Sequence, residues 1–469
     1  MATASAPRQQ FQPPSPVSSL RETPSRKKSV RLTLWPLVAA TFFMVSGGTY
    51  GTEDIVHGAG YGRAILILLL TPILWSLPTA FMIGELSSAL PFEGGYYAWV
   101  RRAMGNFWGF QEAWLSLVAS IFDMAIYPTL FVAYLTRMFP WFQEGHRGVM
   151  VGAAVVAVCA LLNIAGVRVV STTSLWLFFA LSAPFALMIV LAPFKYGALF
   201  HAVMTPTTSK VDMIGGLLIA MWNYMGWDNA STIATEVERP QRTYPRAMLV
   251  AVAIVALSYI LPVAAVWMTG LHSAAWETGS WADIAGLLGG PLLRIALVLG
   301  GMISAFGMFN ALVMSYSRLP LAMAQDGMLP SVFAKLNRRR APWVAIVACA
   351  IGWAMCLGLG FERLVTIDIL LYGTSLALEF IALVVLRICE PELPRAFRVP
   401  GGMLGAIAVG ITPMLLLGFS IVRSESEQVL GMSSFAFGMI LIGAGVVAYF
   451  LNHALKPEGW AAEKPQPAA

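Results

Sequence analysis

Charge is scarce in this chain. Asp, Glu, Lys and Arg together make up 12% of the 469 residues, whereas 58% of the residues are hydrophobic and the mean hydropathy is +0.72. A soluble domain does not bury that much apolar surface, so a soluble globular protein is excluded. The apolar residues run in stretches of about 20, the length of a spanning helix. The composition therefore predicts an all-α polytopic membrane protein.

Cysteine and histidine are scarce as well, at four and five residues. The cysteines fall in or next to apolar stretches, which excludes an extracellular disulfide framework. No HExxH or CxxC spacing and no phosphate-binding loop occur, so we expect no metal, no cofactor and no ATP drive. No nucleophile–base pair can be placed either, and we expect a protein that is not an enzyme. The expected partners are a small molecule and the lipid bilayer, not nucleic acid.

Twelve apolar segments are long enough to span a bilayer. They cover residues 32–52, 63–90, 107–136, 148–164, 172–193, 211–235, 246–269, 291–317, 342–360, 364–386, 403–422 and 431–452.

The distribution of positive charge then gives the orientation. With the N-terminus in the cytoplasm, most of the 30 Lys and Arg residues fall on the inner side. The outer side receives Arg63, Arg137, Arg147, Lys195, Lys210, Arg294, Arg363 and Arg423. We therefore expect a multi-pass protein of the plasma or inner cell membrane with both termini in the cytoplasm.

Two short glycine-containing stretches interrupt apolar segments. Val45–Gly51 interrupts the first segment, and Tyr224–Ser231 interrupts the sixth. Unwound backbone at membrane depth survives only where it lines a cavity or is buried in protein. Interrupted segments at matching places in two halves of a chain point to the substrate site of a transporter. We therefore place the substrate site at these two breaks.

The polar residues of the spans concentrate in the first ten segments, which suggests two five-helix repeats of inverted topology. The predicted parts are a disordered cytoplasmic tail at 1–31, a first repeat at 32–193, a second repeat at 194–386 with its outer connecting loop, two additional helices at 387–452, and a cytoplasmic tail at 453–469.

Asp123 and Asp228 are the acidic residues closest to this site. Asp123 lies near the middle of the third segment, where a charge costs about 2.5–3.5 kcal/mol on insertion scales and no Lys or Arg is at hand. It is predicted to pair with a substrate ammonium or to couple transport to protons; the alternative is a protonated, hydrogen-bonded structural group. Asp228 lies in the second break, where capping the following half-helix is the alternative to binding substrate.

The remaining candidates are glycines, aromatic residues and charged residues near the inner ends of the spans. Glycine-break amides could hold a substrate carboxylate, with close helix packing as the alternative. Aromatic faces could hold a cation, although such residues more often serve packing or the membrane interface. The substrate-binding candidates besides the two aspartates are Ser46, Gly47, Gly48, Tyr50, Gly51, Tyr127, Trp222, Tyr224 and Trp227. The candidates for an inner gate, with solvated surface pairs as the alternative, are Glu85, Arg101, Glu236, Glu238 and Arg242. Asp368 and Glu379 fall inside a span, but the sequence does not orient them.

Several separated blocks together resemble a known family. They are Val45–Gly51, Gly84-Glu85-Leu86 with Pro91–Gly105, Asp123 with Tyr127-Pro128, Trp222–Ser231 running into Glu236–Arg246, Ser317–Pro330, and Leu378-Glu379-Phe380. In this order the chain resembles the amino acid–polyamine–organocation superfamily, and within it the plant-type polyamine-uptake and L-type amino acid transporter branch. The resemblance implies a five-plus-five inverted-repeat fold and a site between the first, third, sixth and eighth helices. It also implies symport or exchange of amino acids or amines.

We therefore expect a secondary active transporter that moves amino acids or cationic amines by alternating access. Protons are the expected coupling ion, with sodium as the alternative. The other open possibilities are a nutrient sensor that keeps the transporter fold, and an exchanger of zwitterionic amino acids. No oligomeric state is predicted.

Overall fold

The computed structural model describes residues 32–91, 94–166, 172–195, 211–271, 276–426 and 428–455. The expected N-terminal tail lies outside these residues, as does most of the C-terminal one. Side chains are not described for residues 172–176, 232–236, 423–426 and 455, so the gate candidate Glu236 is known by its backbone alone.

The first half of the chain is helical almost throughout. Its elements are α1 Leu34–Val45, α2 Glu53–Ala59, α3 Tyr61–Thr71, η1 Pro72–Ser76, α4 Leu77–Ala89, α5 Gly95–Met104, α6 Asn106–Met138, η2 Pro140–Gln143, α7 Arg147–Ile164, α8 Thr172–Leu191 and η3 Ala192–Lys195.

The second half continues in the same way and adds one two-stranded hairpin. Its elements are α10 Met213–Asn223, η5 Trp227–Glu236, α11 Pro240–Trp267, α12 Ser280–Gln325, η7 Ser331–Ala334, α13 Trp343–Met355, α14 Phe361–Cys389, α15 Gly402–Ser426, β1 Gln428–Val429, β2 Met432–Ser433 and α16 Ser434–Leu455. The expected all-α polytopic class is confirmed.

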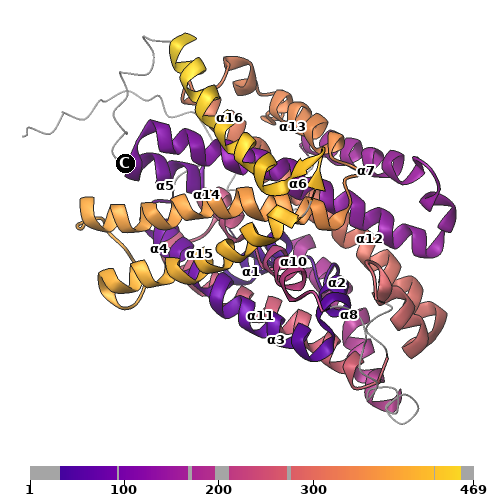
Figure 1. Ribbon diagram of the computed structural model, residues 1–469. Coiled ribbons are helices and arrows are strands. Elements are labelled where there is room, and N and C mark those ends of the chain that lie inside the picture. The colour runs from indigo at the N-terminus through magenta and orange to yellow at the C-terminus, as the bar shows by residue number, and fades with distance from the viewer. Residues whose placement is uncertain are drawn as a thin grey trace, which may run out of the picture.

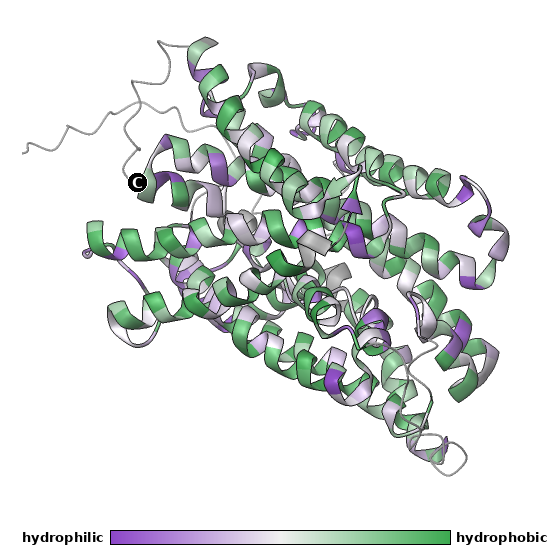
Figure 2. Cartoon of the chain, in the orientation of Figure 1, coloured by the Kyte–Doolittle hydropathy of each residue, from purple (hydrophilic) through white to green (hydrophobic). Residues whose placement is uncertain are grey.

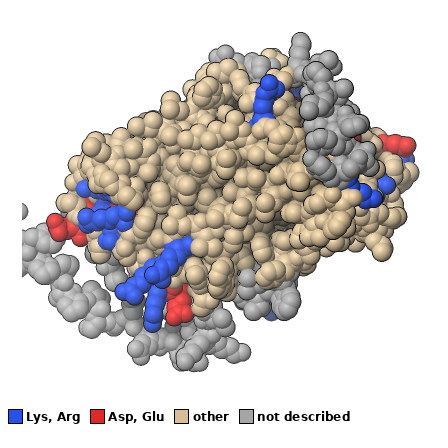
Figure 3. All heavy atoms as spheres, turned by 90° about the horizontal axis from the view of Figure 1, so that it is seen from below, with Lys and Arg blue, Asp and Glu red and all other residues tan. Residues whose placement is uncertain are grey.

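Nine helices of the described chain are long and apolar enough to cross a membrane, and each coincides with an expected span. The other three expected spans contain the shorter helices α1, α10 and α13. Two of these three are short because their segments are broken. Figure 2 shows apolar residues along the outside of the helices, and in Figure 3 most charged side chains gather toward the two ends of the visible face. A broad band without charge separates those ends, as a bilayer requires.

Helices α6 and α14 form the centre of the bundle. They are the most buried of the spanning helices. In each, 72% of the apolar 18-residue stretch is buried inside the protein, whereas the share is 17–28% in α7, α8, α15 and α16. The two helices pack against each other, and α12 and α5 pack on α6 (Figure 1). Polar side chains on α6 and α14 are consequently shielded from lipid.

Both predicted helix breaks are present. Helix α1 ends at Val45 and the chain becomes helical again at Glu53; α10 ends at Asn223 and a 3-10 helix begins at Trp227. Four glycines in the breaks, Gly47, Gly48, Gly51 and Gly226, have φ between +62° and +112°. Glycine adopts this region without steric cost, which explains its presence here. The inverted-repeat relation between the two halves stays a prediction.

Candidate functional site

Asp123 lies in the middle of α6 and is buried, with 3% of its surface exposed. Three aromatic side chains donate hydrogen bonds to its carboxylate. Tyr127 Oη and Trp222 Nε1 donate to Oδ1 at 3.0 and 3.2 Å, and Tyr316 Oη donates to Oδ2 at 3.0 Å. In the part of the chain that the structure describes, Asp123 forms no ion pair. A carboxylate satisfied by neutral donors still carries an uncompensated charge, which favours a cation as its missing partner.

The two breaks meet beside this carboxylate. Asn223 Nδ2 donates a hydrogen bond to the carbonyl of Gly51 at 3.3 Å, and a Cβ on Gly51 would lie 3.1 Å from the ring of Trp222. A Cβ on Gly226 would lie 3.0 Å from the carbonyl oxygen of Met44. The glycines therefore allow the first break to approach the second, and this approach positions Trp222 over Asp123.

Asp228 lies at the start of η5 and is also buried, at 4% exposure. Its Oδ1 accepts a hydrogen bond of 2.6 Å from Tyr372 Oη, which in turn accepts one of 3.2 Å from the amide of Gly226. Tyr372 belongs to α14, so Asp228 links the second break to the central helix.

The other substrate-binding candidates are occupied by internal contacts. Ser46 Oγ accepts a hydrogen bond of 3.1 Å from the amide of Gly48, and Ser304 Oγ donates to the carbonyl of Gly47. The side chains of Tyr224 and Trp227 are fully buried and bond to backbone carbonyls. Of the aromatic candidates, Tyr127 and Trp222 are thus the ones at Asp123.

Tyr50 lies on the other side of the first break, where its ring packs edge-on against Tyr134 and Phe185. The buried Glu53 is in the same region. Its Oε2 accepts a hydrogen bond of 2.7 Å from the amide of Gly51, and its Oε1 accepts bonds from Tyr134 Oη and from the amide of Gly279. Glu53 therefore fastens the first break to α6 and to the start of α12.

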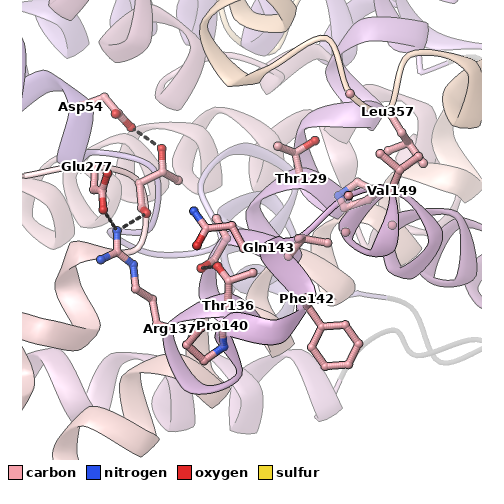
Figure 4. A pocket seen from close by; sticks show the side chains of 18 of the residues that line it. Asp54, Thr129, Thr136, Arg137, Pro140, Phe142, Gln143, Val149, Glu277 and Leu357 are labelled. Carbon is pink, nitrogen blue, oxygen red and sulfur yellow. Dashed lines mark hydrogen bonds and ion pairs between the residues drawn. The ribbon is translucent and has the colours of Figure 1, made fainter.

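A cavity of about 650 Å³ opens at this end of α6. Figure 4 shows Arg137 reaching Glu277 and the carbonyl of Thr278, while the Thr278 hydroxyl donates to Asp54 of α2. Arg137 also pairs with Asp283 at 2.8 Å. By the predicted topology this is the outer side. Asp123 does not line the cavity. The ion pairs of Arg137 and the contacts of Glu53 join α2, α6 and the start of α12 at this end.

The predicted gate residues lie at the opposite end, where the structure gives them other partners than those expected. Glu85 does not pair with α5 or with the 236–246 loop. It is fully buried and binds Arg387 (2.8 Å), Arg395 (3.2 Å) and the amide of Val399 (2.7 Å). Glu85 therefore pairs with α14 and with the segment that follows it, and its place at an inner closure stays a prediction.

Helix α5 makes a second set of contacts at this end. Arg101 pairs with Asp326 at the end of α12, and Tyr97 Oη donates to the same carboxylate at 2.6 Å. Burial and the adjacent Asp326 raise the pKa of Tyr97. Arg102 forms a two-pronged pair with Glu390, at 2.9 and 2.8 Å.

Glu238 and Arg242 are exposed, and neither forms an ion pair among the side chains that are described. Their gate role therefore has no support in these contacts and stays a prediction.

Sequence reasoning missed three residues around the site: Tyr316, Tyr372 and Glu53. A tyrosine in an apolar helix is as common in packing as in binding, so Tyr316 carried no signal of its own. Tyr372 did carry one. Asp368 and Tyr372 repeat the four-residue spacing of Asp123 and Tyr127, which places both members of each pair on one helix face. Glu53 directly follows the first break and lies just outside the predicted span 32–52.

A polytopic helical bundle with two broken helices around a buried, unpaired carboxylate has the architecture of a secondary transporter. The amino acid permease family matches residues 38–448, and the chain belongs to this family. The protein is accordingly a transporter and not an enzyme.

Its curated relatives agree with this assignment. The chain is 34% identical to Polyamine transporter RMV1 of Arabidopsis thaliana over 92% of this chain and 87% of that one. It is 34% identical to Polyamine transporter PUT1 of Oryza sativa subsp. japonica over 89% and 78%. A more distant relative, at 26% identity over 79% and 85%, is the Serine/threonine exchanger SteT of Bacillus subtilis.

Proposed function

We propose that the protein imports a cationic amine, such as a polyamine or an amino acid bound through its ammonium end, together with protons. The observation that carries this proposal is the environment of Asp123. A buried carboxylate held by three neutral aromatic donors supplies the negative charge, and the faces of Trp222 and Tyr127 supply the cation-attracting walls. The names of the plant relatives support a polyamine.

The contacts of the break amides support the same choice. The amides of Gly48 and Gly51 already bond to Ser46 and Glu53, so they are less available to a substrate carboxylate. A zwitterionic amino acid remains the second candidate because a serine/threonine exchanger is among the relatives. In the proposed orientation both termini are cytoplasmic, in the cell membrane, since most Lys and Arg residues then lie inside.

Uptake into reconstituted vesicles tests this function. We expect radiolabelled putrescine to accumulate with an inward proton gradient and to be displaced by other polyamines better than by serine. Asp123→Asn keeps the shape and removes the charge, so we expect putrescine affinity to fall by about 2–5 kcal/mol, roughly 30-fold or more. Asp212→Asn, at the start of α10 and outside this site, is the matched control. Unchanged putrescine uptake by Asp123→Asn would contradict the role of Asp123, and transport of serine without putrescine would favour the second candidate. A sensor would give no uptake.

A further inference from the structure

Three buried acids remain that the proposed substrate site does not use. Glu112 of α6 and Asp368 and Glu379 of α14 are at most 1% exposed. Among the described residues, each has one carboxylate oxygen without a hydrogen-bond partner: Glu112 Oε2, Asp368 Oδ2 and Glu379 Oε2. Buried polar atoms are nearly always bonded in folded proteins, so these three oxygens mark carboxylates whose bonding by the described residues is incomplete.

These acids follow two facing stripes. Asp368, Tyr372, Ser375 and Glu379 recur at intervals of four, three and four residues, which is one face of α14. On α6, Glu112, Ser116 and Asp123 recur in the same manner. Because α6 and α14 pack together, the two stripes form one polar seam. Glu112 and Asp123 are eleven positions apart, which corresponds to about 16 Å along the helix.

Glu112 and Glu379 form the end of the seam away from Asp123. Ser116 Oγ and Ser375 Oγ are 2.8 Å apart, and Ser375 Oγ donates to Glu112 Oε1 at 2.5 Å. Glu379 is one helical turn from Ser375, on the same face. The two serines therefore bridge the helices between the two glutamates.

The titratable groups that face Glu112 and Glu379 are acids and tyrosines. The carboxylate of Asp228 in η5 interacts electrostatically with both glutamates, Glu112 interacts with Glu379, and Tyr96 of α5 interacts with all three acids. Among the described residues no Lys, Arg or His pairs with any of them. Asp228 also contacts Tyr372 of the α14 stripe, which continues the seam toward Asp123 and Asp368.

We propose that Glu112 and Glu379 are a proton-binding site separate from the ammonium site at Asp123, and that the proton which drives transport binds here. This rests on the proposed function. A proton converts one carboxylate to a neutral carboxylic acid, which leaves a single charge on the pair, and it leaves again as H⁺. The two acids cannot both stay charged in a buried site without a cation. A proton occupies no volume, which suits side chains packed as tightly as these.

The test separates two modes of transport in vesicles with the full chain. Glu112→Gln and Glu379→Gln should lower putrescine accumulation driven by a proton gradient by about tenfold or more. Counterflow of putrescine without a gradient should stay within about twofold of wild type. Glu144→Gln removes an exposed carboxylate far from the seam and is the matched control, with both modes expected unchanged. Glu379→Asp keeps the acid and should retain gradient-driven uptake with a shifted pH profile.

Several outcomes would overturn this inference. One is gradient-driven uptake that both Gln variants leave intact. Another is a KM that rises more for spermidine than for putrescine in these variants while the proton response persists, since the pair would then bind the additional ammonium group of the longer polyamine. If the Gln variants do not fold, an unchanged pH profile in Glu112→Asp and Glu379→Asp contradicts it. Failure of the proposed function looks different: wild type would give no putrescine counterflow, and the proton response would then be measured with serine.

Discussion

Two buried acids, Glu85 and Asp123, lie in opposite environments. Glu85 has no exposed surface and two arginines as partners, Arg387 and Arg395, which are themselves only 9% and 4% exposed. Asp123 is equally buried, but its partners are two tyrosines and a tryptophan.

The difference distinguishes an acid whose charge is balanced by described side chains from an acid whose charge is not. The charge of Glu85 is balanced within the protein by two arginines. Removing Glu85 would leave both arginines buried without a counter-charge. The charge of Asp123 has no counter-charge among the described residues, and under the proposed function the substrate ammonium supplies it. A span can thus contain both kinds of acid, and the partner rather than the depth decides which kind each is.

The largest effect on stability is expected at Glu85. Glu85→Ala leaves Arg387 and Arg395 buried without a counter-charge, so we expect a loss of about 3–5 kcal/mol in folding free energy. Thermal unfolding of the purified protein in detergent measures it. The Asp123→Asn variant should be as stable as wild type in this assay, because replacing this carboxylate by an amide leaves no charged partner unpaired.

Glu144→Ala is the matched control for Glu85→Ala. The Glu144 side chain is 73% exposed and pairs with Arg147 three residues away, so its loss should cost at most about 1 kcal/mol. Equal shifts in the melting temperature for the two variants would contradict the claim that the buried ion pairs of Glu85 contribute more to stability than the exposed pair of Glu144.

An intermediate effect on stability is expected at the second break, which positions Trp222 to donate its hydrogen bond to Asp123. Gly226 has φ +86° and its Cβ would lie 3.0 Å from the Met44 carbonyl. We expect Gly226→Ala to cost about 1–3 kcal/mol and to lower putrescine uptake, measured in the same vesicles. Gly360→Ala has a similar φ, +84°, and open space around it. If the two substitutions behave alike, the approach of the two breaks has no energetic role.

Some features of the fold and of the candidate site could be predicted from the sequence, and others could not. Asp123 was predictable because a charged group in an apolar segment has few structural reasons to be there. The breaks were predictable because glycines interrupt otherwise apolar runs. Tyr316 was not, since its partner is 193 residues away and an aromatic residue suits lipid, core and site alike.

The ion pairs at the predicted inner end could not be assigned from the sequence. Glu85 lies near Arg101 in sequence, but its partner Arg387 is 302 residues away. Several Lys and Arg residues lie at that end, so charge and position along the span do not predict which of them pairs with Glu85. In α12 the sequence predicted a span at 291–317, whereas the helix covers Ser280–Gln325 with a kink at Gly290. Its ends continue beyond the apolar run because protein contacts stabilise them.

The smallest effect concerns a third acid, Glu390, which is partly exposed and pairs with Arg102 outside the spans. The hydrogen bonds from Arg102 lower the pKa of Glu390. A lowered pKa means that the pair stabilises the fold above the ordinary glutamate pKa of about 4.3 and that this contribution disappears as the pH falls through the lowered value. We expect Glu390→Gln to cost less than about 1 kcal/mol at pH 7. The difference in melting temperature from wild type should vanish toward pH 3. Because Glu85 is fully buried between two arginines while Glu390 reaches solvent, a Glu390→Gln effect as large as that of Glu85→Ala would mean that burial does not set the strength of these pairs.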